Sequence, residues 1–193
     1  MEHHTKMNWF LLPVVFLVFT IQGFCQDKYS LSESKEMKVS GTSTIHDWDM
    51  VAEGGVTGTA QLTMEGNKLM DISGFKVELK AESLKSGNNK MDKNAYEALT
   101  TNKHPSIIFE LTGPSKIMGN KISTTGKLSI SGSSQTIPVE VTYIVNGNSV
   151  NFIGSKEIKF SDFKIDPPKA VFGTIKTGNE LQLSFNIVFT KAP

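Results

Sequence analysis

The chain has 193 residues, a formal net charge of +1 and 20 basic residues, all of them lysines. Arginine is the residue that proteins favour for bidentate recognition of phosphates and bases, so its absence at this nearly neutral charge argues against nucleic-acid binding. Cys25 is the single cysteine, which excludes disulfides, thiol catalysis and cysteine-based zinc sites from the chain that follows it.

Residues 1–25 are predicted to be a secretory signal peptide. Lys6 precedes an apolar run at residues 9–19, and small or uncharged residues lead to Cys25, which is the usual layout of such a peptide. Cleavage after Cys25 would release residues 26–193 as one domain into the periplasm or the medium. The apolar run is shorter than the ~20 residues of a stable membrane span, although an uncleaved N-terminal anchor is left open.

Strands dominate the rest of the chain. At residues 180–190 nearly every second side chain is apolar, and residues 75–80 and 137–145 repeat the pattern. Successive side chains of a strand point to opposite faces, so each stretch has one dry face and one wet face. Pro138 lies on a polar face and predicts an edge or a bulge there. The predicted strands are 36–40, 42–53, 56–65, 69–81, 106–112, 115–118, 121–131, 135–145, 149–163 and 180–189.

One short helix interrupts this pattern, within a helix and loop insertion near residues 83–105. Met91, Ala95, Ala98 and Leu99 would share one face of that helix, which could plug or lid one end of a barrel. A single short helix cannot cover all the dry faces, so they must meet each other in a sandwich or a closed barrel. The predicted fold class is therefore all-β and antiparallel.

The residues around His46 are the strongest candidates for chemistry. An enzyme hypothesis would use His46 as a base beside Asp47 or Asp49, but along an extended strand both carboxylates point to the opposite face. Trp48 shares the face of His46, and both could point into an apolar cavity. A metal site would need His46 and His104 from distant segments, and the spacing does not require one. No catalytic residue and no metal ligand is predicted.

Four segments in order carry a resemblance to a known family. They are residues 39–48, the helix and following strand at 91–109, the strand at 126–132, and residues 158–165, where Lys164 stands in place of a usual glycine. Together, behind a signal peptide, they resemble the YceI-like family of lipocalin-like secreted bacterial proteins that bind polyisoprenoids. The resemblance covers essentially all of the predicted domain. It implies a lipocalin-like β-barrel holding a long isoprenoid chain.

The mid-strand positions of the dry faces, with two residues near the first strands, are the predicted ligand-binding residues. The Tyr143 hydroxyl could meet a quinone or phosphate head, or make a structural hydrogen bond. The predicted residues are Phe75, Val77, Leu79, Phe109, Val141, Tyr143, Phe185, Ile187, His46 and Trp48.

The predicted function is non-enzymatic binding of a long-chain isoprenoid-like or other amphiphilic lipid inside the barrel, in the periplasm or outside the cell. The only cofactor-like group expected is the bound polyisoprenoid or quinone-like lipid. The predicted partner is this lipid, with no nucleic acid and no membrane span, and a homodimer is left open. Two alternatives stand: a ligand-free barrel that acts through its surface in stress response or adhesion, and an enzyme that uses His46.

Overall fold

The computed structural model describes residues 26–170 and 173–193. The predicted signal peptide lies outside this part of the chain. Within it, no helix has the length and apolar character needed to cross a membrane. The elements are β1 (Asp27–Ser43), β2 (Trp48–Ala52), β3 (Val56–Glu65), β4 (Lys68–Lys80), η1 (Ala81–Ser83), β5 (Leu84–Lys85), α1 (Asn89–Ala98), β6 (Ser106–Leu111), β7 (Lys116–Met118), β8 (Lys121–Ile130), β9 (Ser133–Asn146), β10 (Ser149–Lys159), η2 (Phe160–Phe163), β11 (Lys169–Ala170) and β12 (Ile175–Lys191).

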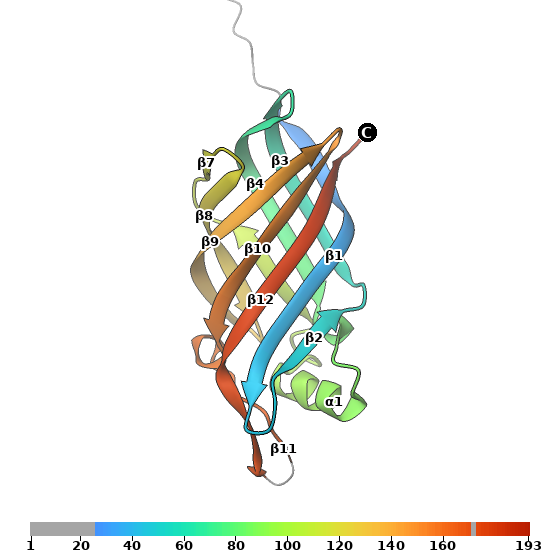
Figure 1. The fold of residues 1–193 in the computed structure, drawn as a ribbon, viewed down its shortest axis with the longest axis vertical. Coiled ribbons are helices and arrows are strands. Elements are labelled where there is room, and N and C mark those ends of the chain that lie inside the picture. Colours follow the sequence, from blue (N-terminus) through green and yellow to red (C-terminus); the bar gives the residue numbers. More distant parts are fainter. Residues whose placement is uncertain (1–25, 171–172) are drawn as a thin grey trace, which may run out of the picture.

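Eight strands close into one antiparallel barrel. Their order around the wall is β1, β3, β4, β6, β8, β9, β10 and β12, and pairing between β12 and β1 completes the circle. The two closing strands cross the front of the barrel side by side in Figure 1. The prediction of an all-β antiparallel barrel with one short helix is confirmed.

The alternation of apolar residues along β12 gives the barrel its interior. Leu181, Ile187 and Phe189 are buried, while Leu183 and Phe185 are partly buried and pack against the same clusters. All five therefore point inward, as their period of two predicts. Burying these side chains away from water is the main force that closes the sheet on itself.

Strand β1 is much longer than the predicted strand at 36–40. Its register against β12 shifts between Leu31 and Glu33 and again between Ser34 and Glu36. Each bulge inserts one extra residue, so the inward positions become Leu31, Ser34 and Met37 rather than every second residue. The strict alternation by which strands are predicted is therefore lost over the first half of β1.

Residues 44–47 correct another prediction, because they form the turn between β1 and β2 and not the middle of a strand at 42–53. The Ser43 hydroxyl lies 3.4 Å and 3.3 Å from the backbone nitrogens of Ile45 and His46, and donates to the His46 carbonyl oxygen at 2.8 Å. Local hydrogen bonds of this kind compete with the strand ladder. The chain reverses here, and β2 begins at Trp48.

Pro138 occupies an edge position, as predicted. Strand β9 pairs with β8 along its length, Pro138 standing opposite Thr125. Its pairing with β10 runs only from Asn146 to Val141. Below Val141 the β10 side of β9 has no strand partner among the described residues, which is where a residue without an N–H donor is tolerated.

Two ends of the barrel interior differ in how they are filled. At the end opposite α1, Phe152 and Phe189 are buried and their ring centroids lie 5.8 Å apart. Phe75 packs against both, at 5.4 Å and 5.0 Å. The two contacts of Phe152 are edge-on, an arrangement that suits the charge distribution of aromatic rings. The result is a solid aromatic core at one end of the barrel.

Glycines in the wall let aromatic rings lie flat across neighbouring strands. A Cβ atom built on Gly126 would collide with the Phe109 ring, and one built on Gly154 would collide with the Phe185 ring. Trp48 covers Gly41 in the same way. Each ring shields a strand that has no side chain of its own, an arrangement known to stabilise glycines in sheets.

Lys164 ends η2 in a left-handed conformation, with φ of 59° and ψ of 33°. A residue with a Cβ is strained there by about 1–2 kcal/mol, whereas glycine is not. We expect Lys164→Gly to raise the free energy of unfolding by up to about 1 kcal/mol, once the greater flexibility of the unfolded glycine chain is subtracted. Urea denaturation measures this. Lys159→Gly, at an extended position with φ of −125°, is the control and should destabilise the protein.

Candidate binding cavity

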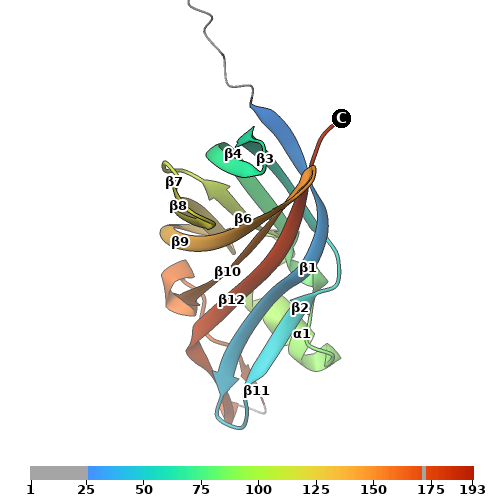
Figure 2. The ribbon, with the colours of Figure 1, turned by 45° about the horizontal axis from the view of Figure 1, so that its top comes forward.

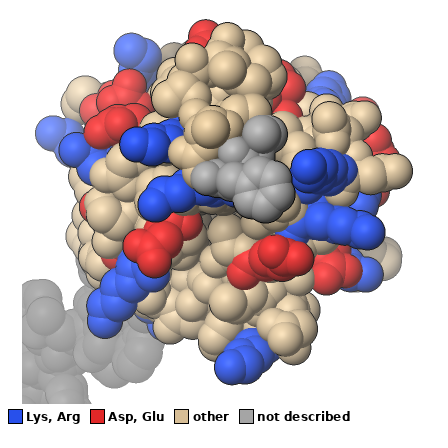
Figure 3. Space-filling view, turned by 90° about the horizontal axis from the view of Figure 1, so that it is seen from below, with Lys and Arg blue, Asp and Glu red and all other residues tan. Residues whose placement is uncertain are grey.

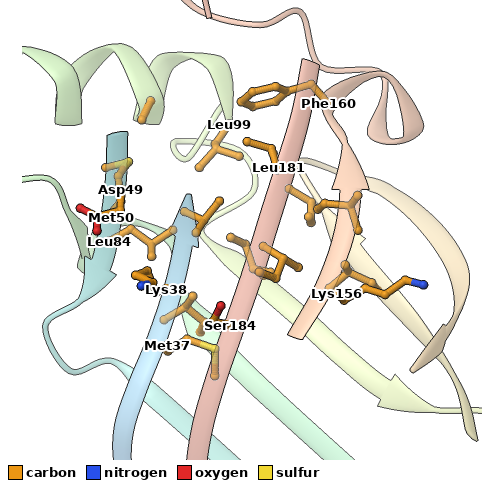
Figure 4. Close-up of a pocket in the computed structure, with 18 of the residues that line it drawn as sticks. Met37, Lys38, Asp49, Met50, Leu84, Leu99, Lys156, Phe160, Leu181 and Ser184 are labelled. Atoms are coloured by element: carbon orange, nitrogen blue, oxygen red, sulfur yellow. The ribbon is translucent and has the colours of Figure 1, made fainter. Parts of the chain in front are cut away.

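A cavity of about 690 Å³ occupies the α1 half of the barrel. This volume falls in the range of sites that bind small organic molecules, about 300–1,000 Å³. The wall is largely apolar, with side chains from β1, β4, β6, β8, β9, β10 and β12. Met37, Met50, Leu84, Leu99 and Leu181 are among those that converge on it in Figure 4.

Nine of the ten predicted binding residues line this cavity, and their role in binding stays a prediction. Phe75 and Ile187 belong to its inner end, where the aromatic core closes the barrel. Further out, the wall includes side chains that were not among the predicted binding residues, such as Leu128, Ile137 and Leu183. The nine are Phe75, Val77, Leu79, Phe109, Val141, Phe185, Ile187, His46 and Trp48.

Tyr143 is the exception. Its side chain is buried, and its hydroxyl donates a 3.0 Å hydrogen bond to the backbone carbonyl oxygen of Gly119. Its ring belongs to the packed core and not to the cavity wall. Tyr143 therefore makes the structural hydrogen bond that was one of its two expected roles, and its hydroxyl does not face the cavity.

Helix α1 forms one side of the cavity at its outer end. Met91, Ala95, Ala98 and Leu99 all contribute to the lining, so the predicted apolar face of the helix is confirmed. Figures 1 and 2 place α1 beside β2, at the end of the barrel away from the C-terminus. The helix thus covers part of that end, as a partial lid.

Local polar contacts fix the start of this helix. Asn88 caps it by accepting hydrogen bonds from the backbone nitrogens of Lys90 at 3.0 Å and Met91 at 3.2 Å. The buried Asp92 carboxylate accepts from the backbone nitrogen and the hydroxyl of Ser86, at 2.9 Å and 2.6 Å. Caps and charge-assisted bonds stabilise short helices that would be marginal alone.

Tyr96 anchors the other side of α1 to the barrel. Its hydroxyl donates to the Leu84 carbonyl oxygen at 2.7 Å and accepts from the Lys85 ammonium at 2.7 Å. The hydrogen bond that Lys85 donates to the Tyr96 hydroxyl raises the pKa of Lys85 above its ordinary value. The apolar face of the helix is in this way held toward the cavity while its polar face meets solvent.

The cavity reaches the surface at the α1 end, where most exposed members of its lining lie. They come from the turn at 44–47, the start of α1 and the loops around η2 and β11. Lysines and acidic residues both surround this end of the molecule in Figure 3. A ligand would therefore meet a mixed polar rim before an apolar interior. The exposed lining residues here are Ile45, His46, Asp47, Asn88, Lys90, Lys159 and Lys169.

His46 lies in the turn at this rim and is exposed. Its Nδ1 donates to the carbonyl oxygen of Asp47 at 2.7 Å, so the ring is held by backbone. Trp48 points inward opposite Gly41, and its Nε1 donates to the Thr42 carbonyl oxygen at 3.0 Å. His46 and Trp48 therefore both border the cavity, one at the rim and one on the wall.

Within the described residues, no three histidine, cysteine, aspartate or glutamate side chains lie close enough to hold a metal ion. His104 is exposed in the turn before β6, packed over Gly132. The two histidines of the barrel domain thus stand on different loops, each with its own local packing.

Comparison with known proteins agrees with this architecture. The model of the YceI-like domain family matches residues 26–189. The chain belongs to the YceI-like domain family. A UPF0312 protein of Azotobacter vinelandii is 30% identical over 103 residues, which are 49% of this chain and 54% of that protein, so the chain matches only about half the length of this relative.

Several solved structures share the fold at low sequence identity. Burkholderia cenocepacia BcnA is 22% identical with a TM-score of 0.61, over 79% of this chain and 95% of that one. A Saccharophagus degradans domain described as polyisoprenoid-binding is 9% identical with a TM-score of 0.62, over 87% and 100%. The Campylobacter jejuni YCEI protein is 16% identical with a TM-score of 0.57, over 97% and 99%.

Proposed function

We propose that this YceI-like protein binds a long-chain isoprenoid-like or other amphiphilic lipid inside its barrel and does no chemistry on it. The observation that carries the proposal is the apolar cavity of about 690 Å³ in the α1 half of the barrel. An interior left unfilled by side chains forfeits packing energy, which a bound apolar chain restores.

The lining suits an alkyl or prenyl chain better than a polar substrate. Apolar surface contributes about 25 cal/mol per Å² when it leaves water, so a long chain can bind tightly with few polar contacts. Methionines such as Met37, Met50 and Met91 adapt to irregular shapes, and all three border the cavity. The S. degradans relative described as polyisoprenoid-binding supports the same ligand class.

The signal-peptide pattern at residues 1–25 supports export to the periplasm or the medium. In that setting the protein would carry or buffer a lipid outside the cytoplasm.

The enzyme hypothesis depends on His46. The ring is exposed in a turn and hydrogen-bonded to a backbone carbonyl oxygen, an arrangement that gives a base no carboxylate partner to orient it. The binding proposal expects His46→Ala to keep the fold and the bound lipid. Loss of a measurable turnover in this variant, with lipid binding intact, would favour the enzyme.

Native mass spectrometry of protein purified from its own organism tests the proposal. The expected result is a second mass, heavier than the chain by one lipid, that organic extraction removes. Protein denatured and refolded without lipid is the control, and should take up a prenyl alcohol such as geranylgeraniol when this is added. A native spectrum with only the bare chain, together with no uptake by the refolded protein, would leave the surface-acting barrel as the better account.

A further inference from the structure

Lys156 is a cation on the inner face of the barrel. In the ladder between β10 and β12 it stands directly opposite Leu183, and opposite residues of an antiparallel pair project from the same face. Leu183 points inward and packs with the core of the α1 half. Lys156 is partly buried between the exposed Ser155 and Glu157, and it borders the cavity.

The strand ladder is interrupted beside this lysine. The pairing of β9 with β10 stops at Val141 and Gly154, so at the level of Lys156 no backbone hydrogen bonds join the two strands. Further down, Gln135 of β9 contacts η2, where its side-chain nitrogen donates to the Asp162 carbonyl oxygen at 2.6 Å. The result is an interruption of the ladder between β9 and β10, here called the gap, which lies between the last paired residues and η2.

The ammonium of Lys156 has no partner within residues 26–170 and 173–193. No hydrogen bond or ion pair involves it among the residues that the structure describes. In Figure 4 its side chain extends away from the apolar side chains that surround the cavity. A charge beside an apolar wall is favourable only where water or an opposite charge solvates it, and Lys156 is exposed enough for either to reach it.

A second polar side chain lies at the same level of the barrel. Thr124 of β8 is opposite Val139 of β9, and it also borders the cavity. The last pair of the β9–β10 ladder is Val141 with Gly154. Two residues further along each strand, the same register brings Val139 next to Lys156. The Thr124 hydroxyl already donates to the carbonyl oxygens of Gly113 and Pro114, so at this level of a largely apolar wall Lys156 is the polar group left to meet a ligand.

We infer that Lys156 binds the anionic head group of the lipid, a phosphate or a carboxylate, at the gap between β9 and β10. This inference rests on the proposed function, since it needs the tail of that lipid in the cavity. The lysine donates charge-assisted hydrogen bonds to the head, while the gap keeps one side of the head in water and so limits its desolvation. Neutral lipids of equal chain length lack this contact.

Pairs of ligands that share one hydrocarbon chain and differ only in the head group test the inference. They also distinguish a phosphate head from a carboxylate head. Geranylgeranyl phosphate is compared with geranylgeraniol, and oleate with oleyl alcohol, by titration of the delipidated protein. Lys156→Met keeps the aliphatic stem and removes the charge. Lys156→Arg keeps the charge. Lys127→Met, on the outer face and bordering no part of the cavity, is the control for loss of one positive charge.

The wild type is expected to bind at least one anion about tenfold or more tighter than its neutral partner, as a charge-assisted hydrogen bond implies. Lys156→Met should remove this preference and leave the neutral affinity unchanged, while Lys156→Arg and Lys127→Met should retain it. Should the methionine variant not fold, Lys156→Gln is read in the same way.

Equal loss for anion and alcohol in Lys156→Met, or an unchanged preference, would overturn the inference and leave the lipid-binding function standing. An equal effect of Lys127→Met would also overturn it, because the preference would then reflect overall charge. If the wild type takes up none of the four ligands, the proposed function itself fails, and the inference fails with it.

Discussion

Val141→Phe is expected to abolish lipid binding while the barrel stays folded. Val141 is half-buried and borders the cavity, so a phenyl ring at this position would occupy space that the ligand needs. In a filled core the same overpacking costs about 1–3 kcal/mol, which lowers the melting temperature by about 2–4 °C for each kcal/mol in a domain of this size. With the cavity present, we expect a shift of less than about 2 °C.

The control is Thr142→Phe, one residue further along β9 and on the outer face of the barrel, opposite Ile153. It adds a similar ring without entering the cavity and should retain the ligand. Lipid extraction and thermal melts on both variants decide the matter. Lowered melting of Val141→Phe, combined with lipid retained at the wild-type level, would contradict the placement of the ligand.

Phe189→Ala is expected to cost about 3–5 kcal/mol of folding stability, the usual range for removing a large buried aromatic side chain. Phe189 has no exposed surface, packs against Phe75 and Phe152, and covers Gly58. Its loss would open a void in the solid end of the barrel, where nothing can fill it. Urea denaturation measures the change.

Phe185→Ala is the matched comparison on the same strand and the same face. Phe185 is only partly buried and already borders the open cavity, so its removal should cost about half as much or less, because the cost depends on the void created. It should weaken lipid binding more than Phe189→Ala does. Equal destabilisation by both substitutions would argue that the α1 half is as closely packed as the other end.

The sequence predicts best where a strand keeps strict alternation. In β12 the inward residues follow from period two alone, and the structure places them as expected. In β1 the two bulges displace Ser34 and Met37 from that period, so the first half of the strand is not recognisable from the sequence. The turn at 44–47 contains no glycine or proline that would mark a chain reversal, and the Ser43 hydrogen bonds that reverse the chain leave no clear mark in composition.

The cavity residues divide in the same way. Dry-face positions such as Phe75 and Val77 could be found from pattern, but the division of the interior into a filled end and an open end depends on three-dimensional packing. Lys156 was missed because a lysine suggests a wet face. Lys156 lies an even number of residues from Phe152 and Ile158, which are both buried on the same strand. Its side chain must therefore share their inward face, and this spacing is the signal that would have placed it inside.

The closing pair of strands has a consequence for how the protein folds. Asp27 at the start of β1 makes a 2.7 Å ion pair with Lys191 at the end of β12, 164 residues later. Pairings between such distant segments form slowly, because the entropy of closing the intervening chain must be overcome first. The sheet therefore cannot become a closed barrel until the last strand has been synthesised. A chain that ends before β12 would leave β1 and β10 as unpaired edges beside an exposed apolar wall, which makes truncated products prone to aggregate.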